Sequence, residues 1–126
     1  MNILILINDA PYGTEKAYNA FRLAMAIQSS GSDPSGGKDH STVQVNVFLM
    51  ADAVGCGLPD QNTPQGYYNI ERMIKSVVLK GGKIKVCGTC ADARGIKNLK
   101  LVDGVEISNM AELAQWTVET DKVFTF

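Results

Sequence analysis

The chain has 126 residues, of which 45% are hydrophobic and 20% are charged, and its formal net charge is −1. This length and composition predict one globular domain, residues 1–126, with a single hydrophobic core. Because the sequence has no run of basic residues, we expect neither a nucleic-acid partner nor binding to an anionic membrane surface.

The cysteines and the first residues indicate the compartment. The chain has three cysteines, an odd number. Its opening apolar run, residues 3–7, has no basic leader and is too short for a signal peptide or a membrane span. Cysteines in such a context are normally reduced thiols rather than a disulfide framework. We therefore expect a cytoplasmic protein with free thiols.

The first third of the chain predicts a strand, a helix and a loop. Residues 3–7 are apolar without interruption, as in a central parallel strand covered on both faces, and residues 9–13 form the turn after it. Apolar residues at helical spacing predict a helix over 14–27. Glycine, proline and polar residues predict a mobile surface loop over 29–42, which contains the single histidine, His40.

The middle of the chain contains the clearest helix. Before it, the pattern predicts a second strand over 43–50, a helical turn over 51–57 and a loop over 58–66. An apolar stripe at helical spacing then predicts the helix. The residues of that stripe are Ile70, Met73, Ile74, Val77 and Val78.

The last quarter of the chain predicts two strands and a helix. Residues 102–107 indicate a turn and a short strand, and residues 122–126 a final strand. Asn109, with Glu112 three residues later, resembles a capping box that starts a helix reaching residue 119. Its predicted inner face holds Leu113, Ala114 and Thr117. Strands alternating with helices predict an α/β domain on a parallel sheet of about five strands.

A strand that runs directly into a short helix places Cys87 at the junction. Gly88 and Thr89 supply the turn and a candidate N-cap. Backbone N–H groups and the helix dipole at such a junction favour an anion, so we expect a lowered pKa for the Cys87 thiol. Arg94 adds positive charge if the helix turns it toward the sulfur. Cys90 completes a C-x-x-C pattern.

Parallel sheets gather reactive groups at the carboxyl ends of their strands. This rule places Cys87 at the functional edge of the sheet independently of any motif. Asp9 and Tyr12, in the first strand-to-helix turn, are candidates to line the Cys87 pocket. For Asp9, pairing with backbone groups of the turn is an equally good interpretation. Asp52 has the same two interpretations.

Several stretches in this order resemble the YchN branch of the DsrE/DsrF-like family, and the resemblance runs over nearly the whole chain. The matching stretches are NDAPYG at 8–13, VFLMADAV at 47–54, GYYNI at 66–70, CGTCADARGI at 87–96, DGVEI at 103–107, AQWTV at 114–118 and DKVFTF at 121–126. Residues 30–42 look like a flexible loop insertion.

The resemblance implies a three-layer α/β/α fold and a homohexamer built as two stacked trimers. Members of the wider family pass sulfur as a cysteine persulfide, so it also implies a protein sulfur donor and a protein sulfur acceptor. The sulfur-accepting position of the family corresponds to Cys87, with Arg94, Gly95 and Ile96 downstream. Cys90 is typical of the YchN branch and has no counterpart at the matching place in the better-defined sulfur carriers.

Three functional interpretations follow. The first is a sulfur-trafficking protein that carries sulfane sulfur on Cys87, and the residues leave open whether it acts as a sulfurtransferase. The second is a non-catalytic oligomeric protein that binds a small ligand. The third is a thiol–disulfide oxidoreductase that uses Cys87 and Cys90. An exposed Cys87 in a pocket shared between subunits favours the first, a fully buried Cys87 the second and a Cys87–Cys90 disulfide the third.

Other site chemistries lack the residues that they need. The spacing of the three cysteines and His40 supports no zinc site, and a hydrolase triad lacks its histidine. No glycine-rich nucleotide loop occurs, so we expect no cofactor. Cys56, in a loop region, is interpreted as incidental.

Overall fold

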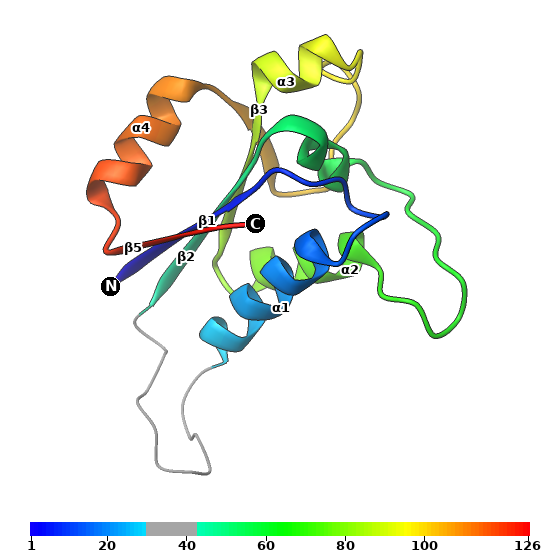
Figure 1. The fold of residues 1–126 in the computed structure, drawn as a ribbon, viewed down its shortest axis with the longest axis horizontal. Helices are drawn as coiled ribbons and strands as arrows, with labels where there is room; N and C mark the ends of the chain where they lie inside the picture. The colour runs from blue at the N-terminus through cyan, green and yellow to red at the C-terminus, as the bar shows by residue number, and fades with distance from the viewer. Residues whose placement is uncertain (30–42) are drawn as a thin grey trace.

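The computed structural model describes residues 1–29 and 43–126 of the chain. The predicted insertion over 30–42, with His40, lies outside the described residues. Strands and helices alternate, and Figure 1 shows the five strands as one sheet. In chain order the elements are β1 (Asn2–Ile7), α1 (Lys16–Gln28), β2 (Gln44–Leu49), the 3₁₀ helix η1 (Ala51–Gly57), α2 (Ile70–Leu79), β3 (Lys83–Cys87), α3 (Gly88–Ala93), β4 (Val105–Ser108), α4 (Met110–Glu119) and β5 (Lys122–Thr125).

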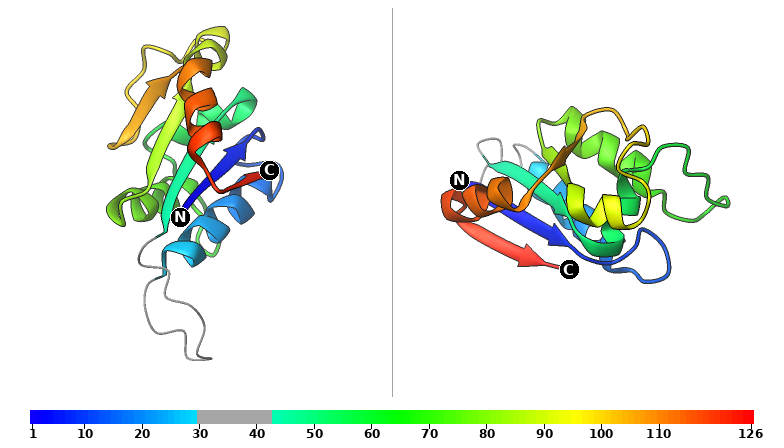
Figure 2. Two further views of the ribbon diagram at one scale, coloured as in Figure 1. Left: turned by 90° about the vertical axis from the view of Figure 1, so that its left-hand side faces the viewer. Right: turned by 90° about the horizontal axis from the view of Figure 1, so that it is seen from above.

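The sheet has the strand order β4-β3-β2-β1-β5, and all its pairs are parallel. The C-terminal strand β5 therefore pairs with the N-terminal strand β1 at one edge, as the two further views in Figure 2 show. Parallel pairing brings the carboxyl ends of all five strands to one edge. The predicted parallel sheet of about five strands is confirmed.

Helices cover the two faces of the sheet unequally. The face that α1 and α2 cover is buried and apolar, with Ile5, Val47 and Ile84 in register across three strands. On the opposite face α4 is the covering helix, and its Trp116 ring meets Phe48 of β2 edge-on, with 6.3 Å between the ring centroids. The arrangement is a three-layer α/β/α sandwich.

The predicted inner face of α4 is partly wrong. Leu113 is buried, but Ala114 and Thr117 are exposed. The Trp116 side chain, rather than Thr117, reaches the sheet, where its ring meets Phe48. The Thr117 hydroxyl instead donates to the Leu113 carbonyl of its own helix, at 2.8 Å. Asn109 caps α4 as predicted, because its side chain accepts a hydrogen bond from the Glu112 backbone N–H.

In the part of the chain that the structure describes, no helix combines the length and apolar character needed to cross a bilayer.

Candidate functional site

Cys87 ends β3 and is itself the N-cap of α3. Its Sγ accepts a hydrogen bond from the Cys90 backbone N–H, with 3.4 Å between sulfur and nitrogen. The predicted junction is therefore confirmed, while Thr89 as its cap is wrong, because the helix already begins at Gly88. One of the N–H groups that a helix start leaves without a backbone partner is thus directed at the sulfur.

The residue after the cysteine must be small because β4 lies close to it. A Cβ at Gly88 would lie 3.0 Å from the Ser108 carbonyl oxygen and 3.2 Å from Ile107 Cγ2. In the β3–β4 register Cys87 pairs with Ser108, which is also buried. The contact fixes the distance between the start of α3 and the neighbouring strand, and so helps to set where Cys87 sits.

The environment of Cys87 does not produce the lowered pKa expected from the sequence. Burial raises the pKa of the Cys87 thiol above its ordinary value, and the hydrogen bond from the Cys90 N–H offsets that effect only in part. Cys87 retains 6% of its exposed surface. The sequence predicts an electropositive junction, but the thiol is packed between β4, α3 and the core. Desolvation of the thiolate therefore raises the pKa more than the backbone N–H groups lower it.

Arg94 is bound to groups other than the sulfur. Its guanidinium lies 2.9 Å from the Asp52 carboxylate and donates to the Cys90 carbonyl at 3.1 Å. These contacts join α3 to η1, which lie side by side at the carboxyl ends of the strands (Figure 1). The interpretation of Arg94 as a charge on the Cys87 thiol is therefore replaced by a structural role, and Asp52 is its partner.

Asp9 and Tyr12 form hydrogen bonds with loop residues at the carboxyl edge of the sheet. The Asp9 carboxylate accepts a hydrogen bond from the Thr14 hydroxyl at 3.0 Å, a side-chain partner rather than the backbone groups that the turn interpretation expected. The Tyr12 hydroxyl donates to Gln61 at 2.7 Å and accepts from the Ile70 N–H at 3.1 Å. Burial raises the pKa of Tyr12. None of these contacts involves Cys87, and the lining of a Cys87 pocket by Asp9 and Tyr12 stays a prediction.

The other two cysteines differ in environment. Cys56 lies in η1 with no exposed surface, and burial raises its pKa to about 12. Cys90 is partly exposed, and all three cysteines are free thiols. Within residues 1–29 and 43–126, no three His, Cys, Asp or Glu side chains come close enough to hold a metal ion. The site therefore consists of one buried and one partly exposed thiol in the first turn of α3.

Sequence reasoning missed a cation on the same face of the sheet as Cys87. Lys85 lies two residues before Cys87 in β3, so the two side chains share a face. Its ammonium pairs with the Glu112 carboxylate and lies 5.0 Å from the centre of the Trp116 ring. The pairing with Lys85 lowers the pKa of Glu112. A lysine inside a strand of a covered parallel sheet was the available signal, since such strands are usually apolar throughout.

The whole chain is similar to proteins of one family. A sequence model of the DsrE/DsrF-like family matches residues 1–126. The chain belongs to the DsrE/DsrF-like family. YchN of Escherichia coli is 44% identical to it over 98% of this chain and 97% of that protein. An uncharacterized protein of Methanocaldococcus jannaschii is 33% identical over the full length of both chains.

Solved structures have the same fold as this chain. The crystal structure of E. coli YchN superimposes with a TM-score of 0.86, at 43% identity, over 99% of this chain and 98% of that one. A protein of unknown function from Methanobacterium thermoautotrophicum shares the fold, with a TM-score of 0.68 at 12% identity over 99% of this chain and 98% of its own. The resemblance read from the sequence is confirmed, and so is the α/β fold that it implied.

Proposed function

We propose that this protein is a sulfur carrier that accepts sulfane sulfur on Cys87 as a persulfide and hands it to an acceptor. The observation that carries the proposal is the position of the Cys87 sulfur. It stands at the carboxyl end of β3 and accepts the Cys90 N–H in the first turn of α3. Membership of the DsrE/DsrF-like family supports the same chemistry.

The accepting step is a displacement at sulfur. Cys87 loses its proton to solvent, and its thiolate attacks the outer sulfur of a persulfide on a donor protein. The donor's S–S bond breaks, the new S–S bond forms on Cys87, and the donor cysteine leaves as a thiolate. One sulfur atom moves and no net oxidation or reduction takes place.

The donating step reverses the roles of the two sulfurs. A thiolate of the acceptor protein attacks the outer sulfur on Cys87, and Cys87 leaves as a thiolate. The Cys90 N–H, 3.4 Å from Sγ, is then directed at the atom on which negative charge develops, and such a hydrogen bond stabilises the leaving group. Because the donor is a backbone group, it remains when the Cys90 side chain is changed.

Burial of Cys87 has a functional consequence in this proposal. With its pKa raised, the thiol is protonated in most molecules at neutral pH and is protected from small oxidants. Its outer sulfur, once attached, extends about 2 Å beyond Sγ. The acceptor therefore needs to reach only that outer atom.

Two observations favour other functions. Cys90 lies in the same helical turn as Cys87, which suits a thiol–disulfide oxidoreductase that closes a Cys87–Cys90 disulfide. The small exposed fraction of Cys87, 6%, suits the non-catalytic ligand-binding protein, in which the cysteines are passive.

The proposal also includes assembly and compartment. We infer a homohexamer of two stacked trimers from the family resemblance, and the apolar side chains that α4 and β5 expose, Val118, Val123 and Phe124, support association through that region. Light scattering is expected to give about 82 kDa, six times the chain mass of 13.6 kDa, and a mass of one chain contradicts the inference. We place the protein in the cytoplasm, where its thiols stay reduced.

Intact-mass measurement after incubation with a polysulfide tests the proposal. The wild-type protein and Cys90→Ser are expected to gain one sulfur atom that a reductant removes, while Cys87→Ser gains none. A loss of two hydrogens that needs both cysteines establishes the oxidoreductase instead. No change in any of the three proteins refutes the carrier and leaves the binding protein.

A further inference from the structure

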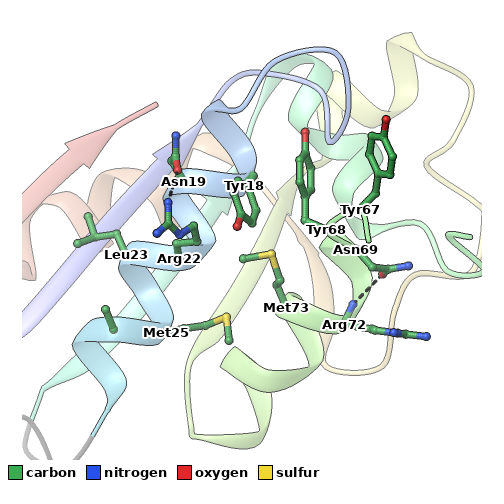
Figure 3. Close-up of a pocket in the computed structure, with 11 residues that line it drawn as sticks. Tyr18, Asn19, Arg22, Leu23, Met25, Tyr67, Tyr68, Asn69, Arg72 and Met73 are labelled. Carbon is green, nitrogen blue, oxygen red and sulfur yellow. Dashed lines mark hydrogen bonds between the residues drawn. The ribbon is translucent and has the colours of Figure 1, made fainter. Parts of the chain in front are cut away.

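A groove lies between α1 and α2, on the face of the sheet opposite to Cys87. Its volume is about 760 Å³, within the range of about 300–1,000 Å³ that small-molecule sites occupy. Figure 3 shows Met25 of α1 and Met73 of α2 pointing into the space between the helices. Tyr18, Tyr67 and Tyr68 line the end of the groove where both helices begin.

A stack of rings fixes one wall of the groove. Tyr68 stacks on Tyr18 with 4.2 Å between ring centroids and an interplanar angle of 16°, and Tyr12 stacks against Tyr68 at 5.9 Å. On the other side of Tyr18 the Arg22 guanidinium lies 5.3 Å from the ring centre. The stack therefore positions a cation at the groove before any ligand arrives, which lowers the entropic cost of binding.

The charge at the groove is positive. Arg22 on α1 and Arg72 on α2 both line the groove, and among the described residues that line it none is acidic. Among the ion pairs of the described residues none includes either arginine. The Arg22 side chain donates to Asn19 at 3.2 Å, a neutral partner, and both arginines are exposed. Their charges are available to an anion.

One aromatic ring is also available for stacking. Tyr67 retains 70% of its exposed surface, whereas Tyr18 and Tyr68 are engaged with one another. Tyr67, Asn69 and Arg72 also line a neighbouring polar hollow of about 340 Å³ formed by the loop before α2. An exposed ring and a guanidinium thus stand together at the junction of an apolar groove and a polar hollow.

We propose that this groove is a binding site for a small planar organic anion, separate from the Cys87 site. The ring system of the ligand lies over the methionines and against Tyr67, and its anionic group binds Arg22 or Arg72. Guanidinium groups suit carboxylate, phosphate and sulfonate oxygens because their N–H donors match the geometry of those anions. The volume and the two separated cations favour a ligand of about two fused rings over a bare inorganic anion.

Fluorescence titration with 8-anilinonaphthalene-1-sulfonate, a planar aromatic anion, tests the proposal. The matched neutral probe is N-phenyl-1-naphthylamine, which has the rings without the sulfonate. Arg22→Gln and Arg72→Gln each remove one charge from the groove. Lys97→Gln removes one charge from an exposed position outside it. The Cys87→Ser protein separates this site from the sulfur chemistry.

The sulfonate probe is expected to bind more tightly than the neutral probe. Its dissociation constant is expected to rise about tenfold in at least one of Arg22→Gln and Arg72→Gln, as for loss of a charge-assisted hydrogen bond. Lys97→Gln and Cys87→Ser are expected to match the wild type. Equal binding of the two probes, or unchanged affinity in both arginine variants, overturns the proposal. No binding to the wild type, with an altered assembly mass in the arginine variants, also overturns it and makes the groove an interface between copies of the chain.

Discussion

The reactivity of Cys87 as a function of pH is the most direct consequence of its environment. Burial raises its pKa above the ordinary value of 9.0, so less than about 1% of the thiol is ionised at pH 7. Alkylation by iodoacetamide proceeds through the thiolate. Its rate at Cys87 is therefore expected to rise about tenfold between pH 7 and 8 and to keep rising toward pH 9 without a plateau.

The assay is peptide-level mass spectrometry of the alkylated protein over this pH range. It is best made in Cys90→Ser, which removes the competing thiol and keeps the backbone N–H that binds the Cys87 sulfur. Cys56 provides an internal control, because burial raises its pKa to about 12 and leaves it with no exposed surface. It is expected to stay unmodified while the protein is folded.

A rate at Cys87 that levels off below pH 8 would refute this reasoning. Such a plateau would show a lowered pKa, and hence that the helix start and its N–H groups outweigh burial. The lowered pKa that the sequence predicts for the Cys87 thiol would then be correct, and desolvation would not be the larger effect.

Two further substitutions test the packing around the site and α2. Gly88→Val is expected to destabilise the fold by about 1–3 kcal/mol in chemical denaturation, because its Cβ would lie 3.0 Å from the Ser108 carbonyl oxygen; unchanged stability contradicts that close approach. The Lys75 ammonium and the Gln61 N–H lower the pKa of Glu71 below its ordinary 4.5. This stabilisation is complete above about pH 4.5 and is lost as pH falls through the lower folded-state pKa. Denaturation curves of Glu71→Gln are therefore expected to depend less on pH below 4.5 than those of the wild type, and equal slopes contradict the assignment.

Local pattern was sufficient for the scaffold of the protein. The unbroken apolar run 3–7 predicted β1, because a strand buried on both faces is apolar at every position. The apolar stripe that starts at Ile70 predicted α2, because burial of one helix face repeats apolar residues at helical spacing. The position of Cys87 followed from the same logic. A strand that passes into a helix puts the residue at the junction on the carboxyl edge of a parallel sheet.

What the sequence did not determine depends on residues distant in the chain. Arg94 binds Asp52, 42 positions away, and Tyr12 binds Gln61, 49 positions away. Neither pairing leaves a periodic signal. The direction of the Cys87 pKa shift depends on the burial of the thiol, which results from tertiary packing. A charge or a helix start near a thiol is visible in sequence, whereas desolvation of that thiol is not.

The central claim is that Cys87 carries the sulfur. Its most direct test is tandem mass spectrometry of the protein after treatment with a persulfide donor and rapid alkylation, which locates the added sulfur on a residue. We expect one additional sulfur atom on Cys87, present also in Cys90→Ser and transferred to a thiol acceptor when that acceptor is added. An added sulfur found on Cys90 or Cys56 while Cys87 stays unmodified contradicts it.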